Sequence, residues 1–454
     1  MNRTVAAIST APGRAGVALV RVSGPDVPEI CSKLGLFGLQ PRQSSYRHLH
    51  DPDTGEVVDH ALVTLFAGPA SYTGEDVLEI STHGGAIVPH LVLDAVVAAG
   101  AALAAPGEFT RRAYLNGKLD LIQAEATLDL VDARSPAMQR AAVHQLERGL
   151  SERVEEMRRQ LLELQALLAY DIDFPEEDDG ALDVAAIAAA AAELQGQMLE
   201  LLSLAPEGEL LHDGALVVLA GRPNVGKSSL FNSLHGRQRA IVTPVPGTTR
   251  DAIESVISLD GYPFRLVDTA GLRSTSDEVE ELGVEVARSY LAEADIILFC
   301  TEAGAAPDPE DERFLAQVDE DRPPQRSSRV IKVRTKADMV TEGASEVGWR
   351  DGAIAVSALT GQGMAELRQR LSQAAFGGLR RAESPPLITK TRQSRALRRA
   401  SGELEAFQEA LKMGPAEIAS THAAEVTLAL EELLGVVATD DILDVVFGSF
   451  CVGK

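Results

Sequence analysis

The feature that most constrains the fold of this 454-residue chain is a glycine-rich loop between an apolar run and a helix-forming run. The apolar run is Ala215–Ala220, and the loop that follows, residues 221–228, reads GRPNVGKS and matches the pattern GxxxxGK[ST]. In this pattern the backbone N–H groups surround a phosphate chain, Lys227 places a charge at the β- and γ-phosphates, and the Ser228 hydroxyl binds Mg²⁺. The sequence therefore predicts a P-loop nucleotide site at a helix N-terminus.

Short apolar runs continue after this loop and alternate with helical patterns. Residues 253–259 and 264–267 flank Asp260-Gly261, a strong signal for a two-residue hairpin turn. Further buried strands are expected at residues 296–300, 330–333 and 354–356. This pattern predicts a mainly parallel α/β sheet of the Ras-like P-loop class.

Four further motifs, in order and at suitable spacing, indicate that the nucleotide is GTP and that the domain hydrolyses it. Residues 247–251 (GTTRD) resemble a first switch, whose Thr249 would close on Mg²⁺ and the γ-phosphate. Residues 268–271 (DTAG) resemble the DxxG switch, in which Asp268 holds Mg²⁺ through water and the Gly271 N–H contacts the γ-phosphate.

The remaining two motifs address the base. Residues 335–338 (TKAD) resemble the guanine-binding NKxD, because the Asp338 carboxylate can accept from guanine N1 and N2, which adenine cannot offer. Thr335 stands where Asn is usual, a change that can weaken base affinity but leaves the carboxylate in place. Residues 357–359 (SAL) resemble the loop whose backbone binds guanine O6. The predicted nucleotide-site residues are Asn224, Val225, Gly226, Lys227, Ser228, Ser229, Thr243, Pro244, Val245, Pro246, Gly247, Thr248, Thr249, Asp268, Thr269, Ala270, Gly271, Thr335, Lys336, Ala337, Asp338, Ser357, Ala358 and Leu359.

Two positions bear on how hydrolysis would proceed. Leu272 follows the DxxG motif, where Ras-type proteins place a glutamine that orients water, so another group must do this. Asn224 resembles the asparagine of GTPases that bind K⁺ beside the phosphates, where a cation can replace an arginine finger. The alternative is that Asn224 is a simple turn residue.

The flanks of this domain differ from it in pattern. Residues 1–118 alternate β-rich runs with Gly and Pro turns, with strands expected at 5–9 and 17–22, and predict a small α+β domain. Apolar residues at spacings of three and four from Leu146 to Leu168 predict one long helix, and an Ala-rich helix is expected to end near Leu204. Helical patterns return after Gly377, so we predict domains at 1–118, 119–212, 213–378 and 379–454, the third inserted into a helical domain.

The charge and the cysteine content of the chain limit the cellular compartment and the kinds of partner that can be expected. The net charge is −25, so direct nucleic-acid binding requires a local basic patch or a partner, unless the charge merely aids solubility. The three cysteines are far apart in sequence, which is typical of a reducing compartment and excludes a CxxC metal or redox pair. The sequence shows no secretory signal and no apolar run of 18 residues, so a cytoplasmic protein without a membrane span is expected.

A ribosome-assembly GTPase of the Era or EngA kind is one interpretation of the P-loop. The flanks favour another, because they contain no second P-loop and no GXXG-bearing module. They carry GRAG (13–16), GEDVLE (74–79), HGG (83–85), PGEFT (106–110), LNGKLD (115–120) and the tail FCVGK (450–454). Together these motifs resemble the MnmE (TrmE) family of tRNA-modification GTPases over essentially the whole chain.

The resemblance implies a folate-binding-like N-terminal domain that dimerises, a helical domain and a G domain. It implies a potassium-activated GTPase whose G domains dimerise and which acts with an FAD-dependent partner subunit, MnmG or GidA, in a heterotetramer or larger complex. The reaction adds a carboxymethylaminomethyl or aminomethyl group at C5 of the wobble uridine of certain tRNAs. The implied cofactors are GTP, Mg²⁺, K⁺ and a 5-formyl or methylene tetrahydrofolate.

Family roles are carried over by matching motif. Arg21, Glu79, Lys118 and Lys454 correspond to the folate pocket, although in isolation Arg21 and Glu79 would be interpreted as a surface pair. Glu280 corresponds to the residue that positions water, although alone it would be a solvated helix charge. The implied metal ligands are Ser228 and Thr249 for Mg²⁺, and Asn224, Thr243, Val245 and Thr248 for K⁺.

Cys451 is the third candidate catalytic residue, with Lys227 and Glu280. Its thiolate could attack C6 of uracil and activate C5. The alternative is a buried tail cysteine that only packs. The sequence leaves these two interpretations open.

Overall fold

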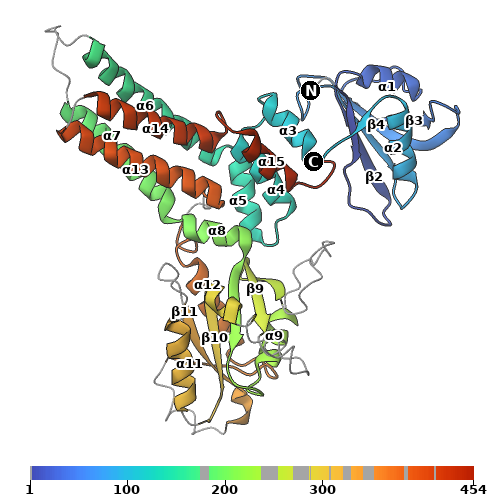
Figure 1. The fold of residues 1–454 in the computed structure, drawn as a ribbon. Coiled ribbons are helices and arrows are strands. Elements are labelled where there is room, and N and C mark those ends of the chain that lie inside the picture. The colour runs from blue at the N-terminus through green and yellow to red at the C-terminus, as the bar shows by residue number, and fades with distance from the viewer. Residues whose placement is uncertain are drawn as a thin grey trace. The chain divides into compact units, whose positions relative to one another are not determined.

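The computed structural model describes residues 3–173, 184–236, 254–268, 286, 288–305, 308–320, 329–340, 352–382, 387–413 and 416–454 (Figure 1). The chain divides into two compact units. Unit 1 comprises residues 1–128, 146–163 and 424–454, and unit 2 comprises residues 129–145 and 164–423. These two units group residues by contact in space, whereas the four domains predicted from the sequence are consecutive segments of the chain. The predicted boundaries at 118, 212 and 378 therefore stay a prediction.

Unit 1 contains a six-stranded sheet in the order β3-β4-β5-β2-β1-β6. Its strands are β1 (Val5–Ile8), β2 (Val17–Ser23), β3 (Ser45–His50), β4 (Val57–Phe66), β5 (Val77–His83) and β6 (Ala102–Leu103). All pairs are antiparallel except β1 with β6. The two strands predicted from the sequence at 5–9 and 17–22 are confirmed as β1 and β2.

Alternation along β2 gives the sheet two different faces. Val20 and Val22 are fully buried and belong to the core cluster that includes Val92 and Val96 of α2 (Val88–Ala98). Arg21 lies between them in sequence, and its side chain therefore points to the opposite face. The helices α1 (Val27–Lys33) and α3 (Glu108–Leu115) complete this part of the unit.

The helical segments of the first half of the chain are α4 (Leu121–Val131), α5 (Pro136–Leu146) and α6 (Gly149–Asp173). The predicted apolar face from Leu150 to Leu168 is confirmed, since Leu150, Val154, Met157, Leu161, Leu164 and Leu168 are all buried. The prediction that Leu146 belongs to the same helix is wrong. Leu146 ends α5, and Arg148 has a φ of 68°, a left-handed conformation that interrupts a right-handed helix.

Unit 2 contains the second six-stranded sheet, in the order β12-β11-β10-β7-β9-β8. Its strands are β7 (Ala215–Ala220), β8 (Glu254–Leu259), β9 (Tyr262–Asp268), β10 (Ile296–Glu302), β11 (Arg329–Thr335) and β12 (Ile354–Ala355). Only the β8–β9 hairpin is antiparallel, and its turn residues Asp260 and Gly261 both have positive φ. The predicted hairpin and mainly parallel sheet are therefore confirmed.

Unit 2 also contains α5 and the end of α6, together with helices that follow them in the chain. Among the latter are α8 (Ala205–Asp213), α9 (Lys227–Gly236), α11 (Pro309–Glu320) and α12 (Met364–Phe376). Two longer helices, α7 (Val184–Ser203) and α13 (Thr391–Met413), pack side by side (Figure 1). The predicted end of the Ala-rich helix near Leu204 is confirmed by α7.

The last two helices are α14 (Ala416–Leu434) and α15 (Asp440–Gly448). Among the helices that the structure describes, none combines the length and apolarity needed to cross a bilayer.

Candidate functional site

The P-loop follows β7, the central strand of a parallel sheet, and leads directly into α9. All six residues of β7 are buried, because both faces of the strand are covered. Gly221 has a φ of 135°, and a Cβ added there would lie 2.2 Å from the carbonyl oxygen of Cys300. Only glycine fits at this position, so the close approach of the loop to β10 requires the first glycine of the motif.

Hydrogen bonds to the backbone of the P-loop hold the Lys227 side chain in place. Asn224 and Gly226 have φ values of 62° and 99°. The Lys227 side chain is buried, and its ammonium donates hydrogen bonds to the carbonyl oxygens of Gly221 at 2.8 Å and Arg222 at 2.6 Å. The charge therefore lies inside the loop, where a phosphate chain wrapped by the loop would meet it.

The two side chains predicted to hold Mg²⁺ meet at the ends of adjacent elements. Ser228 is in the first turn of α9, and Asp268 is the last residue of β9, which pairs with β7. The Ser228 hydroxyl donates to a carboxylate oxygen of Asp268 at 2.7 Å. A hydroxyl and a carboxylate are oxygen ligands of the kind that Mg²⁺ prefers, so this donor set fits the ion.

The predicted guanine-binding segment lies where β11 ends. Thr335 is buried, and its hydroxyl lies within hydrogen-bonding distance of the carbonyl oxygens of Val225 and Thr301 and can donate to either. Val225 belongs to the P-loop, so Thr335 connects the base-binding segment to the phosphate-binding loop. This connection is the role that the structure shows for the unusual threonine, and the sequence did not predict it.

Residues 336–338 follow Thr335 and include the Asp338 carboxylate that is predicted to bind guanine. Lys336 has a φ of 56°, and its ammonium forms an ion pair with Glu302 at 2.9 Å. Ala337 donates its N–H to the carbonyl oxygen of Val356 at 3.0 Å, which joins this segment to the loop at residues 357–359. Asp338, in the short 3₁₀ helix Ala337–Met339, is exposed. The structure therefore places both predicted base-binding segments side by side, with the carboxylate open to a ligand.

A backbone hydrogen bond and the burial of Ser357 fix the loop at residues 357–359. The Ser357 N–H donates to the Gln362 carbonyl oxygen at 3.0 Å, and the side chain of Ser357 is fully buried. Leu359 is exposed. Of the other predicted members, Ser229 is exposed in the first turn of α9 and Ala358 is half-buried. The rest lie outside the described residues, namely Thr243, Pro244, Val245, Pro246, Gly247, Thr248, Thr249, Thr269, Ala270, Gly271 and the water-positioning candidate Glu280.

A second group of predicted residues meets on the N-terminal sheet. Arg21 of β2 and Glu79 of β5 are paired in register, and the guanidinium donates through Nε at 3.1 Å and Nη2 at 2.8 Å to one carboxylate oxygen. The guanidinium also lies 5.4 Å from the Tyr72 ring centre and 5.7 Å from that of Phe109. A charged pair beside two aromatic rings can hold a planar polar ligand.

The C-terminal tail packs on this same sheet. The Ser9 hydroxyl donates to the Gly453 carbonyl oxygen at 2.9 Å, and the Phe109 N–H donates to the Lys454 carbonyl oxygen at 3.2 Å. Gly453 has a φ of 99°, and a Cβ there would lie 2.5 Å from the Ile8 carbonyl oxygen. Phe450 is buried and anchors the tail. The tail therefore lies against the N-terminal sheet of its own chain.

Lys454 ends near Arg21. Burial, and then the positive charge of Arg21, lower the pKa of the Lys454 ammonium. The structure thus brings together three of the four predicted folate-pocket residues. Lys118, the fourth, is exposed, and its ammonium donates to the Pro69 carbonyl oxygen at 3.1 Å.

A cavity of about 610 Å³ is lined by residues from three of the motifs that carry the family resemblance. Gly13 and Ala15 come from the GRAG motif, Gly85 from the HGG motif, and Val452 from the tail. Sequence motifs that are far apart along the chain are therefore close together in unit 1.

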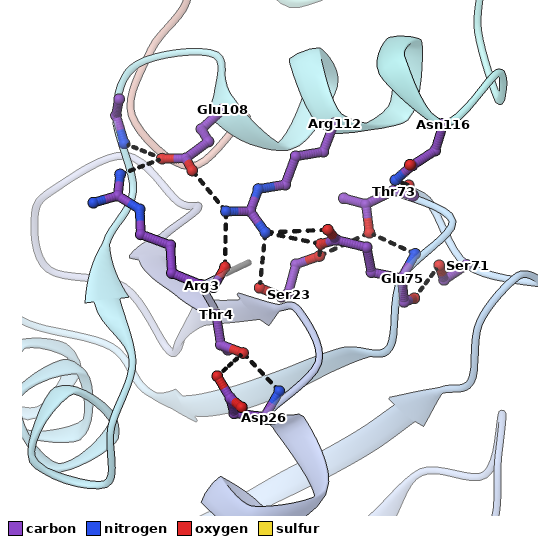
Figure 2. A network of polar contacts seen from close by, with 11 residues as sticks. Arg3, Thr4, Ser23, Asp26, Ser71, Thr73, Glu75, Glu108, Arg112 and Asn116 are labelled. Carbon is purple, nitrogen blue, oxygen red and sulfur yellow. Dashed lines mark hydrogen bonds and ion pairs between the residues drawn. The ribbon is translucent and has the colours of Figure 1, made fainter. Parts of the chain in front are cut away.

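A buried network joins α3 to the end of β2 and to Glu75 (Figure 2). Arg112 is 3% exposed and forms ion pairs with Glu75 at 2.9 Å and Glu108 at 2.8 Å. It also donates to the backbone carbonyl oxygens of Arg3 and Ser23. Sequence reasoning missed this network, as well as Tyr72, Phe109 and Ser9. Phe109 could have been found as the aromatic residue of the PGEFT motif.

The three cysteines have different environments. Cys31 and Cys300 are buried, and burial raises the pKa of their thiols to about 11 and about 12. Cys451 is exposed, so the interpretation of this residue as a buried packing cysteine is wrong. Its exposure leaves the catalytic interpretation open.

Comparisons with known proteins cover both the N-terminal part of the chain and the part that contains the P-loop. The profile of the MnmE helical domain matches residues 121–451, and that of the N-terminus of the GTP-binding protein TrmE matches residues 4–118. The tRNA modification GTPase MnmE of Geobacter sulfurreducens is 41% identical over 99% of both chains. The proteins of the same name from Chloroflexus aurantiacus and Stutzerimonas stutzeri are each 42% identical, over 100% and 99% of both chains. The chain therefore belongs to the MnmE (TrmE) family of GTPases, and not to the Era or EngA families.

Proposed function

We propose that this chain hydrolyses GTP with Mg²⁺ and that hydrolysis drives the modification of the wobble uridine of certain tRNAs. The observation that carries the proposal is the contact between Ser228 and Asp268 beside the buried Lys227. The relatives are named tRNA modification GTPases, which supports the second half of the proposal.

The chain's own residues suit each part of GTP binding. The loop at residues 221–228 and the Lys227 ammonium would bind the phosphates, and the Asp338 carboxylate would accept from guanine N1 and N2. Ser228, Asp268 and Thr249 would hold Mg²⁺, which supplies charge compensation when bound. Glu280 would orient water, as the family resemblance implies.

We propose that K⁺ activates this hydrolysis and that the G domains dimerise during the cycle. Asn224 has a left-handed backbone conformation with a φ of 62° and is exposed, so its side-chain amide is accessible to a ligand. Thr243, Val245 and Thr248 would complete the K⁺ site. A cation there would stabilise the negative charge that develops in the transition state, as an arginine finger does in other GTPases.

The N-terminal site would take a tetrahydrofolate derivative. The Arg21–Glu79 pair, the adjacent rings and Lys454 offer a carboxylate for ring N–H groups and cations for the folate's own carboxylates. Cys451 would attack the uracil. We place the whole reaction in the cytoplasm, in a homodimer that works with an FAD-dependent partner subunit.

The first experiment measures GTP and ATP hydrolysis by the full chain in K⁺ and in Na⁺ buffers of equal ionic strength. We expect GTP to be preferred strongly and K⁺ to accelerate its turnover by at least about tenfold, since charge compensation of this kind is worth roughly 10³–10⁵ in related systems. Lys227→Ala serves as the inactive control. Equal turnover of ATP and GTP would contradict the guanine assignment, and equal rates in K⁺ and Na⁺ would remove the potassium step.

A further inference from the structure

The cavity at one end of the N-terminal sheet belongs neither to the GTP site nor to the site at Arg21. Its volume of about 610 Å³ falls within the range of roughly 300–1,000 Å³ that is typical of small-ligand sites. It is lined by β1, the start of β2, α2, β6, the loops at residues 10–15 and 85–86, and Val452 of the tail. All of these segments belong to unit 1, so the cavity lies within one compact body.

The cavity and the site at Arg21 use different faces of this sheet. Ala18 lines the cavity and is buried, as is Val20, which faces the core two positions further along β2. The Arg21 side chain points to the opposite face. The tail contacts both places, since Val452 lines the cavity and Lys454 ends near Arg21. Two residues of extended chain span at most about 7 Å, so the two sites are neighbours along the tail.

The chemistry of the lining argues against a charged ligand. Among the described residues that line the cavity, none is Asp, Glu, Lys or Arg, and the polar side chains are those of Thr10 and His90. The other lining residues are alanine, glycine, proline, valine, leucine and isoleucine. A folate carries a glutamate tail whose carboxylates need cations, such as Arg21 and Lys454 at the other site. The cavity therefore suits an uncharged ring better than it suits the folate.

Backbone donors at the cavity are free to bind such a ring. The two loops are held together, because the Gly84 N–H donates to the Gly16 carbonyl oxygen at 3.3 Å. Four N–H groups of lining residues in these loops have no hydrogen-bond partner in the part of the chain that the structure describes, namely those of Gly13, Ala15, Gly85 and Ala86. Uracil is an uncharged planar ring with two carbonyl acceptors, O2 and O4. His90 is exposed, and an imidazole ring can stack on a base.

The position of the tail indicates which ring the cavity takes. Val452 lines the cavity, and the residue before it, Cys451, is exposed. The proposed attack of this thiol on uracil requires the ring to come within roughly 3.5 Å of the sulfur. Three lining residues are themselves exposed, Val17 by 60%, Leu103 by 62% and Val452 by 53%, so the cavity is open to solvent and a ring can enter it.

We infer that this cavity receives the uracil ring of the wobble nucleotide after the base has left the anticodon stack. The inference rests on the proposed function for the identity of the base. The apolar walls replace the stacking that a flipped base loses, and the free N–H groups donate to its carbonyl oxygens. The tail then lies between the folate site at Arg21 and the base in the cavity, with the Cys451 thiol beside the base.

The test uses an anticodon stem-loop RNA with 4-thiouridine at the wobble position, which on irradiation forms crosslinks to groups in contact with it. The full chain is irradiated with this RNA, and the crosslinked peptides are identified by mass analysis. Two variants narrow the cavity from exposed lining positions, Ala11→Phe and Ala86→Phe. The control is Ala98→Phe, at an exposed alanine at the end of α2 that does not line the cavity. The affinity of each form for 5-formyltetrahydrofolate is measured in parallel.

We expect the wild type to crosslink within residues 8–18, 85–93 or 451–454. Both cavity variants should lose at least about tenfold in crosslink yield, because the ring can no longer be buried, and the control should keep it. All four forms should bind the folate equally. Wild-type crosslinks elsewhere in the chain, or none at all, would overturn the inference without reference to any variant.

Two further results would also overturn it. One is a wild-type crosslink yield in both cavity variants, and the other is a loss of folate affinity in both of them, which would assign the cavity to the folate. Failure of the proposed function itself would appear in GTP turnover or in the tRNA of cells lacking the chain, neither of which the crosslinking measurement uses.

Discussion

The Ser228 hydroxyl and the Asp268 carboxylate lie 2.7 Å apart, although forty positions separate them in sequence. This contact exists because β7 and β9 are adjacent parallel strands, so the loop after one and the last residue of the other meet at the same edge of the sheet. The two motifs of the nucleotide site are thus joined by the topology of the sheet.

Thr335 is the position where this site departs from the usual motif, and its substitution tests what the hydroxyl does. Thr335→Val removes the donor shared by the carbonyl oxygens of Val225 and Thr301. Loss of one buried hydrogen bond costs about 1–2 kcal/mol, so we expect GDP and GTP to bind roughly tenfold more weakly. Titration with a fluorescent nucleotide measures this. Thr335→Ser keeps the hydroxyl and should bind nearly as tightly as the wild type, whereas wild-type affinity in the valine variant would exclude the proposed connection.

Asp338 should determine which base is bound. Asp338→Asn replaces an acceptor by an amide donor, which suits the C2 carbonyl of xanthine and not the amino group of guanine. Two lost charge-assisted hydrogen bonds predict a loss of roughly 100-fold or more in GTP affinity, together with a gain in affinity for xanthosine triphosphate. Competition between the two nucleotides measures both effects. An unchanged preference for GTP would mean that another group selects the base.

Features of this site that depend on neighbouring residues in the sequence can be predicted from the sequence, whereas features that depend on backbone conformation or on distant residues cannot. The strand before the P-loop, the hairpin at Asp260-Gly261 and the motif order follow from local patterns and were predicted. The end of α5 at Leu146 was not, because apolar spacing continues across a break caused by the backbone of Arg148. Periodicity shows which residues face the core, but not where the backbone changes direction.

The N-terminal site was predicted mainly through the family resemblance. Arg21 and Glu79 are adjacent because β2 and β5 pair in one register, which no local pattern determines. The contact of Ser9 with Gly453 joins residues 444 positions apart. Long-range contacts of this kind depend on the tertiary fold, so only the family resemblance, and no local pattern, predicted that Lys454 of the tail lies near Arg21.

Cysteine reactivity tests the environment of the tail. Cys31 and Cys300 are buried with raised thiol pKa values, whereas Cys451 is exposed. We therefore expect iodoacetamide to label the native chain at Cys451 at least about tenfold faster than at the other two cysteines, because only an accessible thiolate reacts. Peptide mass analysis after timed labelling measures each rate. Equal labelling of all three cysteines in the folded protein would contradict the burial of Cys31 and Cys300.

The network around Arg112 predicts a specific pH dependence of stability. Burial raises the pKa of Glu108, but hydrogen bonds from the Ala105 N–H and the Arg112 guanidinium outweigh it, so that the net pKa lies below the ordinary value of 4.5. A carboxyl group whose pKa is lowered by folding stabilises the protein above its unfolded pKa and loses this contribution as the pH falls through its folded pKa.

Glu108→Gln should therefore be less stable than the wild type at pH 7, and the difference should shrink below about pH 4.5. Chemical denaturation of both forms from pH 7 to pH 3 measures it. A difference that stays constant with pH would show that the charge of Glu108 does not contribute to the network.

The central claim is that GTP hydrolysis at Lys227 drives modification of the wobble uridine of tRNA. The most direct measurement is mass analysis of tRNA nucleosides from cells that lack this chain and are complemented with the wild type, Lys227→Ala or Cys451→Ser. We predict that only the wild type restores an aminomethyl-type group at C5 of the wobble uridine, because the alanine variant cannot hydrolyse GTP and serine is a far weaker nucleophile than cysteine at neutral pH. Full modification with Cys451→Ser would remove that thiol from the reaction, and full modification with Lys227→Ala, or in cells without the chain, would contradict the account.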